Sequence, residues 1–472
     1  MIFSKSTLIA AASALLILFG AAAPTRATPS IVVDVASGAV LSHDQATASW
    51  YPASVTKLMT AYVALDAVRQ GRISLDTPVM MSPRACSMAP SKMGFRPGSE
   101  VTLQNALIML MVKSANDIAV AIAEGVSGSV EAFADEMNRH SAALGMTQSI
   151  WVNPNGLPDA RQVTSARDLA ILGRALYLQF PEHANLFNIG AMRLGKQIIP
   201  THNHLLGRYA GADGMKTGFT CSAGFNLVAS ATRGGRRLIA VVLGAPNPIL
   251  RTAKTAALLD RGFQSGAAVA SLASLPSSGP TAAPDLRESV CHHRGPAAAE
   301  FMAEIEDASV PVGSGVPLLD TLGGAPQQQM NAKEIAHLPR PRFEPVPVYV
   351  GRAPGYAGPV ARSRAPGAPV GEQPDLAAYA SSQPEASDAS ASPISKPAPD
   401  AVSLRRAKHT KAVKAARAAK AAAKADAAKV DVVVDEPAPK PKAARSATKP
   451  KAAAAQKPAA SKAHSAAEQG KS

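Results

Sequence analysis

Three short segments of this 472-residue chain carry side chains suited to nucleophilic catalysis, in the order Ser54-Val55-Thr56-Lys57, Ser114-Ala115-Asn116 and Lys216-Thr217-Gly218. Ser54 and Lys57 are three residues apart, so on a helix they share one face and the amine can accept the hydroxyl proton. In the third segment a second lysine precedes a glycine, which allows a strand to approach a substrate closely. Together the segments indicate serine acyl-enzyme chemistry.

The order, spacing and flanks of these segments resemble those of penicillin-binding proteins and serine β-lactamases, and most closely the low-molecular-mass penicillin-binding proteins, which are serine D-alanyl-D-alanine carboxypeptidases. The resemblance implies an enzyme that removes the terminal D-alanine from peptidoglycan stem peptides through a serine acyl-enzyme and that β-lactams inhibit covalently. It covers residues 28–264 and includes the segments Ser114 to Asp117, Asn153 to Leu157, Ser165 to Ala170 and Asn203 to Leu206.

The resemblance implies a catalytic role for each residue of the first two segments. Ser54 is the nucleophile, Lys57 accepts its proton, and Ser114 relays a proton to the departing amine. Asn116 holds Lys57 and an amide on the acyl side of the substrate. Free lysine titrates near about 10.4, so Lys57 needs a lowered pKa, which burial and the second cation, Lys216, would provide.

The third segment is implied to bind the substrate. Lys216 and Thr217 hold the free terminal carboxylate, and Gly218 permits the close backbone approach. The backbone N–H groups of Ser54 and Phe219 form the oxyanion hole. A substrate without the carboxylate would leave a buried cation unpaired, which favours carboxypeptidase substrates. No metal ion or other cofactor is expected.

Hydrophobic periodicity predicts the elements that position these residues. Residues 31–35 and 39–41 form two strands around a turn, and residues 237–243 form a later strand. Strands at both ends of a helical middle predict an α/β fold with an antiparallel sheet flanked by helices, in agreement with the β-lactamase/transpeptidase-like fold of the resembling family. Helices are expected from near Ser54, with Val55, Leu58, Met59, Tyr62 and Leu65 on one face, at residues 103–111 and 130–144, and at 249–263.

Residues 1–27 have the pattern of a cleaved secretory signal peptide, with Lys5 before an apolar run at residues 8–23 and small residues after it. The apolar run is shorter than the roughly 20 residues of a membrane span, which disfavours a retained membrane anchor. We therefore expect export across the inner membrane, to a location that is periplasmic or peripheral to the membrane.

Charge divides the remaining chain into regions. Residues 28–264 contain 21 Lys and Arg against 15 Asp and Glu, residues 265–402 contain 9 against 14, and residues 403–472 contain 17 against 5. Residues 265–402 are predicted to be a mostly disordered Pro/Gly/Ala-rich linker, with short stretches at 298–305 and 345–350 that can order. Neither a small all-β second domain nor an amphipathic anchoring helix, both common in the resembling family, is indicated.

Residues 403–472 are predicted to be a disordered Lys/Ala/Pro-rich basic tail, because they lack the apolar residues of a core. Such tails also occur on nucleic-acid binders, but export removes the chain from nucleic acid, so none is expected as a partner. Contact with anionic envelope polymer or lipid headgroups and a purely solvating role are both compatible with this composition.

Several other reactive residues are predicted to be structural. His202 and His204 would offer two imidazoles to zinc, but no third ligand at suitable spacing accompanies them, so a zinc site is not expected. Asp168 is expected to fix its loop. Among the three cysteines, Cys86 and Cys221 both flank candidate site segments and could pair if their distance allows it, and the sequence leaves the pairing open.

Two residues depart from the pattern of the resembling family. Asn155 occupies a position where some relatives have histidine, and Phe219 follows the Lys-Thr-Gly segment where some have histidine. The first is expected to affect a loop. The second leaves the backbone N–H available but changes the rim of the site.

Three alternative functions remain, and the first two would use the same site. A D,D-endopeptidase would cut cross-links with the same residues. A class A β-lactamase needs a glutamate in a Glu-x-x-Leu-Asn segment to activate the deacylating water, whereas this chain offers only Glu182-His183-Ala184-Asn185-Leu186, so slow deacylation of penicillin is expected. A non-catalytic cell-wall scaffold would act through the tail. The presence of all the residues of the catalytic segments argues against this function.

Overall fold

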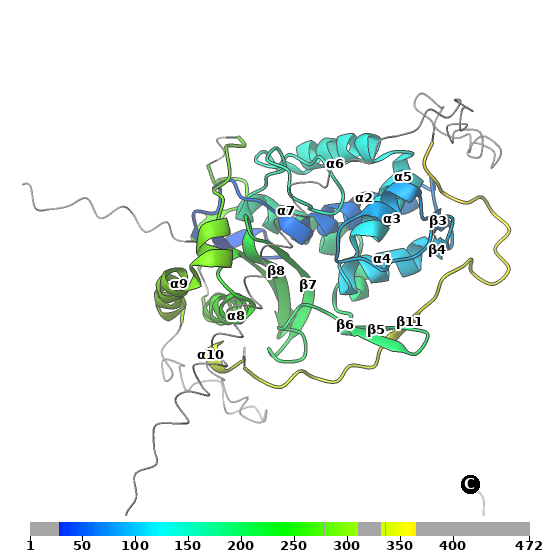
Figure 1. Ribbon diagram of the computed structural model, residues 1–472. Helices are drawn as coiled ribbons and strands as arrows, with labels where there is room; N and C mark the ends of the chain where they lie inside the picture. The colour runs from blue at the N-terminus through cyan, green and yellow to red at the C-terminus, as the bar shows by residue number, and fades with distance from the viewer. Residues whose placement is uncertain (1–27, 266, 277–278, 310–331, 336, 365–472) are drawn as a thin grey trace, which may run out of the picture. The chain divides into compact units, whose positions relative to one another are not determined.

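The computed structural model describes residues 28–265, 267–276, 279–309, 332–335 and 337–364 (Figure 1). The predicted signal peptide (1–27) and basic tail (403–472) lie outside the described residues. The described strands are β1 (Ser30–Asp34), β2 (Ala39–Asp44), β3 (Pro78–Met80), β4 (Glu100–Thr102), β5 (Ala191–Leu194), β6 (Gln197–Pro200), β7 (Ala212–Thr220), β8 (Gly224–Arg233), β9 (Arg236–Ala245), β10 (Ala270–Ser271) and β11 (Val346–Val348). The described helices are η1 (Ala53–Thr56), α2 (Lys57–Arg69), α3 (Pro83–Ser87), α4 (Leu103–Val112), α5 (Asn116–Ser127), α6 (Val130–Leu144), α7 (Ala166–Gln179), η2 (Pro181–Phe187), α8 (Pro248–Gln264), η3 (Glu288–His292), α9 (Arg294–Ala308) and α10 (Ala332–Ile335).

The main sheet has six strands in the order β10-β2-β1-β9-β8-β7, and all neighbouring strands pair antiparallel. β1 pairs with β9, so strands from the two ends of the catalytic region lie side by side, and the helical middle of the chain is inserted between β2 and β7. The predicted fold class, an antiparallel sheet flanked by helices, is confirmed. β7, which carries the Lys-Thr-Gly segment, is an edge strand of this sheet.

Both faces of the sheet are buried. Successive residues of a strand face opposite sides, and in β1 both sides are apolar: Ile31 and Val33 belong to the cluster that includes α2 and α7, whereas Val32 belongs to the cluster that includes α8 and α9. The sheet is therefore a rigid layer between two groups of helices, and one of these groups contains Lys57.

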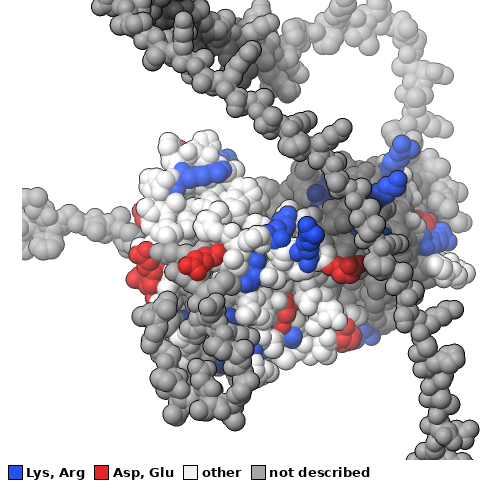
Figure 2. Space-filling model, turned by 90° about the horizontal axis from the view of Figure 1, so that it is seen from below, with Lys and Arg blue, Asp and Glu red and all other residues white. Residues whose placement is uncertain are grey.

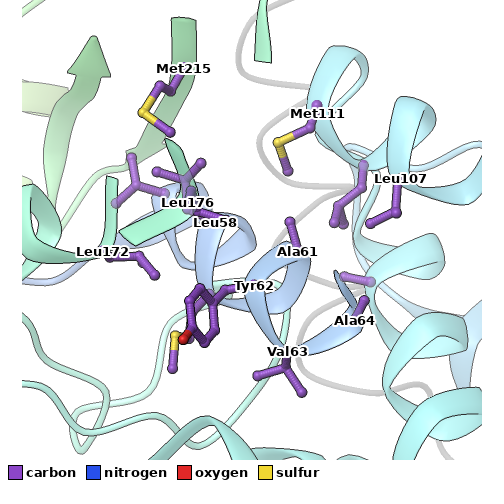
Figure 3. Close-up of a cluster of buried hydrophobic side chains, with 14 of the residues drawn as sticks. Leu58, Ala61, Tyr62, Val63, Ala64, Leu107, Met111, Leu172, Leu176 and Met215 are labelled. Atoms are coloured by element: carbon purple, nitrogen blue, oxygen red, sulfur yellow. The ribbon is translucent and has the colours of Figure 1, made fainter. Parts of the chain in front are cut away.

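Helix α2, which begins at Lys57, is buried around its whole circumference rather than on one face. Every residue from Lys57 to Ala67 is buried. A helix that is apolar all round belongs in the interior, and α2 occupies the middle of the helical layer. In Figure 3 its side chains lie between residues of α7 and α4, as shown by Leu58, Ala61 and Tyr62 of α2, Leu172 and Leu176 of α7, and Leu107 and Met111 of α4.

Part of the predicted linker is folded against the catalytic region, which differs from the expectation for residues 265–402. The stretch expected to order at 298–305 lies within α9, where Phe301 and Ile305 join the apolar cluster on α8. Lys254 of α8 forms an ion pair with Glu304 of α9. A few apolar residues of α9 are enough for this packing, because α8 contributes its own apolar residues to the same cluster.

Residues 338–364, which we call the strap, run along the outside of the catalytic region (yellow in Figure 1). Its strand β11 pairs in parallel with β5. Beyond β11 the strap pairs with the two-stranded β3–β4 sheet, where Gly351 N donates to Glu100 O at 2.7 Å and Ala361 N donates to Pro78 O at 2.8 Å. These backbone bonds require no apolar alternation, so the sequence pattern did not reveal them.

Among the described residues, no helix combines the length and the apolar composition needed to cross a membrane. Figure 2 shows one face of the molecule, on which basic and acidic side chains of the described residues are interspersed. That face of the described residues therefore carries no large field of a single sign.

Candidate active site

The nucleophile candidate lies in a short 3-10 turn just before α2. η1 carries Ser54, and α2 begins at Lys57. Lys57 Nζ lies 3.1 Å from Ser54 Oγ. The preceding residue, Ala53, has a φ of 48°, a left-handed value that non-glycine residues rarely adopt. Such constrained residues cluster at functional sites, and this one directs the chain sharply into the turn that presents Ser54.

Lys57 is completely buried and has further acceptors besides Ser54. Its Nζ donates to Asn116 Oδ1 at 2.7 Å and to the backbone oxygen of Asn155. Burial lowers the pKa of Lys57 well below its usual value, and the charge of Lys216 lowers it further, against an opposing effect of Asp117. An amine with a lowered pKa can act as a general base near neutral pH.

The second and third segments meet through Lys216 and Ser114. Lys216 Nζ donates to Ser114 Oγ at 2.9 Å and to the backbone oxygen of Thr217 at 2.9 Å. Ser114 lies between α4 and α5 with a φ of 60°. Burial, followed by the charge of Arg251, lowers the pKa of Lys216 to about 7. The fold thus brings the three segments together in one place.

Two glycines allow the backbone around Ser54 to be approached closely. A Cβ on Gly218 would lie 2.9 Å from both Ser54 N and Pro52 O. Gly156 has a φ of 79°, and a Cβ there would lie 1.8 Å from Ala53 O. The close approach at Gly218 was predicted from the Lys-Thr-Gly segment, whereas that at Gly156 was not, because its only signal is its position in the Asn-Pro-Asn-Gly-Leu segment.

Buried polar side chains fix the loops around the site. The carboxylate of Asp117 accepts hydrogen bonds from the backbone N–H groups of residues 93–94 at 3.0 and 2.8 Å. Asn226 of β8 donates from Nδ2 to the carbonyl oxygens of residues 51–52 at 2.9 and 3.1 Å. Asn226 therefore attaches the segment before Ser54 to the sheet, a role that depends on tertiary structure and has no local sequence signal.

The segments line a catalytic cavity of about 460 Å³. Three basic residues that the motifs did not assign to the site also line it: Arg251 of α8, His202 and His204. Arg251 is only 3% exposed, its Nε has no hydrogen-bond partner among the described residues, and burial lowers its pKa to about 10. The cavity is bounded by Ser54, Pro90, Ser91, Ser114, Asn116, Gly156, Leu157, His202, His204, Thr217, Gly218, Phe219, Thr220, Phe225, Pro248 and Arg251.

The two histidines are neutral at pH 7. Burial and then the charge of Lys216 lower the pKa of His202 to about 4, and burial and then the charge of Arg251 lower the pKa of His204 to about 4. Within the described residues, no group of three or more His, Cys, Asp or Glu side chains is arranged to hold a metal ion.

The acidic residues considered from sequence lie away from the reacting groups. Asp168 accepts hydrogen bonds from Gln148 N and Ser149 Oγ, both at 2.8 Å, and so fixes that loop. Glu182 is 60% exposed in η2 and is not among the lining residues of the catalytic cavity. Among the described residues, the lining of this cavity contains no carboxylate.

The structure decides the disulfide pairing that the sequence left open. Cys221 is bonded to Cys291, with Cα atoms 5.7 Å apart, whereas Cys86 is a free thiol that donates to Phe95 O at 3.3 Å. The Cys86–Cys221 pair that the sequence allowed does not form, because Cys291, in the region predicted to be a linker, folds back beside the end of β7 and bonds to Cys221.

The two departures from the family pattern have different surroundings. Asn155 Oδ1 accepts a hydrogen bond from Leu157 N at 3.0 Å, so its side chain shapes its own loop. Phe219 lines the catalytic cavity, is 42% exposed and stacks on Phe225, with ring centroids 4.0 Å apart. An apolar ring therefore stands at the rim of the site.

Comparison with known proteins agrees with this geometry. Residues 19–247 match the peptidase S11 family, D-alanyl-D-alanine carboxypeptidase. D-alanyl-D-alanine carboxypeptidase DacC of Escherichia coli (strain K12) is 37% identical over 273 residues, which cover 54% of this chain and 68% of DacC. DacF of Bacillus subtilis (strain 168) is 34% identical over 242 residues, which cover 50% of this chain and 62% of DacF.

Among solved structures, penicillin binding protein 5 from Haemophilus influenzae is 36% identical, with 50% of this chain and 71% of that chain covered and a TM-score of 0.48. The chain thus spans about two thirds of the length of its curated relatives. With its identity to DacC over that length, the chain belongs to the D-alanyl-D-alanine carboxypeptidase family.

Proposed function

We propose that this protein is a serine-type D-alanyl-D-alanine carboxypeptidase that removes the terminal D-alanine from peptidoglycan stem peptides and is acylated by β-lactams. The observation that carries the proposal is that one cavity is lined by two serines, each in contact with a buried lysine: Ser54 with Lys57 at 3.1 Å and Ser114 with Lys216 at 2.9 Å. The first supplies a nucleophile with its base, and the second supplies a proton relay beside a cation.

Acylation begins when Ser54 Oγ attacks the carbonyl carbon of the penultimate D-alanine. Lys57 Nζ takes the hydroxyl proton, which its buried position favours by lowering its pKa. Asn116 Oδ1, 2.7 Å away, keeps the amine aligned during this transfer. The backbone N–H groups of Ser54 and Phe219 stabilise the oxyanion that forms.

The tetrahedral intermediate then collapses and the bond to the terminal D-alanine breaks. Ser114 donates its hydroxyl proton to the departing amine and is reprotonated from the lysine system. Water next attacks the ester carbon, Lys57 takes the water proton, and Ser54 leaves with that proton as a free hydroxyl. The cycle consumes one water and returns every side chain to its starting protonation state.

Specificity for a free terminal carboxylate follows from the cations in the cavity. Arg251 and Thr217 of β7 line the cavity, and the buried Lys216 contacts Ser114, which also lines it. A carboxylate pairs with these groups, whereas an amide or ester terminus leaves a buried charge uncompensated, at a cost of about 1–3 kcal/mol.

Slow hydrolysis of the penicilloyl ester follows from the absence of a carboxylate in the lining of the described cavity. In class A β-lactamases a glutamate activates the deacylating water. The site favours a penicillin-binding carboxypeptidase over a β-lactamase for this reason. The pattern of residues 1–27 supports export to the periplasm or the membrane periphery, and the basic residues 403–472 support contact with anionic envelope polymer or lipid.

Intact-mass spectrometry of the full chain after incubation with penicillin tests the proposal. We expect one penicilloyl adduct on the wild type and on the control Ser87→Ala, whose serine lies outside the cavity, and none on Ser54→Ala. The wild type should also release D-alanine from a peptide that ends in two D-alanines. An unmodified wild type with intact penicillin would contradict the catalytic assignment, and rapid loss of penicillin without an adduct would indicate a β-lactamase.

A further inference from the structure

One side of the catalytic cavity is formed by the loop at residues 201–208, which joins β6 to β7 and which we call the histidine loop. His202 and His204 of this loop line the cavity. Asn203 between them is 4% exposed, and its Nδ2 donates to Gly214 O of β7 at 2.8 Å. The histidine loop is therefore attached to the first residues of β7.

The histidine loop lies on the leaving-group side of the cavity. A Cβ on Gly218 would lie 2.9 Å from Ser54 N, so the scissile carbonyl lies beside Gly218. Lys216, proposed to hold the terminal carboxylate, is two residues earlier in β7, and Gly214 is two residues earlier again, about 7 Å further along the strand. A leaving segment longer than one alanine can therefore extend past Lys216 toward the histidine loop.

The strap packs against the histidine loop on its way from α10 to β11 (Figure 1). At one end of the loop, a Cβ on Gly207 would lie 2.7 Å from the Pro341 ring, so the strap closely covers this glycine. At the other end, Arg340 Nη2 donates to Thr201 O at 3.3 Å. The strap thus brings an arginine from beyond residues 19–247, which match the family, to the loop that lines the cavity.

Two arginines meet where the strap contacts the histidine loop. Arg208 of the loop donates from Nη1 to His204 O at 3.3 Å and from Nε to Pro339 O at 3.2 Å. Burial, followed by the charge of Arg340, lowers the pKa of Arg208, so the two cations lie near each other. Among the described residues, no carboxylate forms an ion pair with either guanidinium. Backbone carbonyl oxygens therefore position both groups without neutralising their charge.

The positive charge continues from these arginines into the cavity. Burial and then nearby cations, among them Arg340, lower the pKa of both His202 and His204 to about 4. Arg251 lines the same cavity, and the lining contains no carboxylate among the described residues. A concave site lined by charges of one sign attracts the opposite charge, so this side of the cavity favours an anionic leaving segment.

We propose that Arg208 and Arg340 form a subsite for a second carboxylate in the leaving segment of the substrate, beyond the terminal carboxylate at Lys216. Planar guanidinium groups bind carboxylates with parallel hydrogen bonds. The second carboxylate belongs to an acidic terminal residue or to the released peptide of a cross-link. The same bond breaks as in the proposed function, and Ser114 again protonates the departing amine. The inference rests on that function and adds a preference on the leaving-group side.

The test measures kcat/KM of the full chain for two pairs of substrates that differ only in the second carboxylate. In the first pair the terminal residue is D-glutamate or D-glutamine. In the second pair the released peptide of a cross-linked dimer carries its far carboxylate free or amidated. We expect the free carboxylate to be favoured about fivefold in at least one pair, the effect of one partly exposed charged contact. The pair that shows the preference identifies the source of the carboxylate.

The double variant Arg208→Gln/Arg340→Gln should lose this preference, and thermal melts show whether it is folded. Arg340→Lys keeps the charge and should retain part of the preference. Arg342→Gln is the matched control, because it removes a charge from an exposed residue of the strap that has no hydrogen bond to the histidine loop among the described residues. It should keep the preference of the wild type.

Salt gives a test that does not depend on any variant. Raising the salt concentration to about 1 M shortens the range of charge interactions to about 3 Å, so the preference of the wild type should fall. No preference in either pair, a preference that salt leaves unchanged, or one that persists in the folded double variant would overturn the subsite. Failure of the wild type to cleave a peptide that ends in two D-alanines would instead overturn the proposed function.

Discussion

Lys216 donates a hydrogen bond of 2.9 Å to the hydroxyl of Ser114. The cation proposed to hold the substrate carboxylate is therefore in direct contact with the hydroxyl proposed to relay the leaving-group proton. Because Lys216 also lowers the pKa of Lys57, one side chain links carboxylate recognition to both proton transfers. Its own protonation state should consequently be visible in the kinetics.

The pH dependence of kcat/KM should report Lys216. Its pKa is lowered to about 7 by burial and by Arg251, so it is cationic below pH 7 and neutral above. For a peptide with a free terminal carboxylate, kcat/KM should fall about tenfold per pH unit above pH 7. For the same peptide with an amidated terminus, kcat/KM should be lower and lack this decline. Identical alkaline limbs for both peptides would contradict the role of Lys216.

Asn116→Ala should slow acylation by penicillin about 100-fold, within the range that a misaligned general base produces. The variant removes the 2.7 Å acceptor of Lys57 Nζ. Asn105→Ala is a matched control, because Asn105 is equally buried and donates to Tyr349 O outside the catalytic cavity. Stopped-flow measurement of the acylation rate, together with thermal melts, separates the loss of alignment from a loss of stability. Equal losses of rate in the two variants would mean that Asn116 acts only through stability.

Gly156→Ala should damage both stability and acylation. The new Cβ would lie 1.8 Å from Ala53 O, so the turn that carries Ser54 must move, at about 3 kcal/mol or about 10 °C in Tm. Gly145→Ala is the control, because Gly145 has a similar φ of 75° but no atom within 4 Å of an added Cβ, which leaves only about 1 kcal/mol of backbone strain. Calorimetry gives the Tm of each variant, and penicillin binding gives its rate of acylation. Equal losses in the two variants would contradict the close approach of Gly156 to Ala53 O.

Removal of the strap should destabilise the catalytic region. A chain that ends after His337 lacks β11 and the backbone bonds of Gly351 and Ala361, whereas a chain that ends after Arg364 keeps them. The shorter chain should melt about 5 °C lower by calorimetry, because several backbone hydrogen bonds on the edges of β5 and the two-stranded β3–β4 sheet are lost. Equal melting temperatures would show that the strap contributes nothing to stability.

Much of the fold could be predicted because its signals are local. The strands near residues 31–35 and 237–243 and the central helices follow from hydrophobic periodicity. The burial of α2 on all sides could not be predicted. Whether a helix is buried on one face or all round depends on which other elements pack against it. The packing of α9 and the pairing of the strap were not predicted for a related reason. Both bind to a helix surface or a strand edge that exists only after the catalytic region has folded.

The sequence by itself determined the candidate catalytic set, since Ser54 with Lys57 and Ser114 with Asn116 occur within single turns or loops whose spacing fixes their reach. Only the tertiary structure decided which distant residues join them. Arg251 comes from α8, which follows the strand β9, and Cys291 reaches Cys221 from a segment with no strand or motif signal. The physical reason is that contacts between residues far apart in the chain depend on how whole elements pack, and no local pattern records that packing.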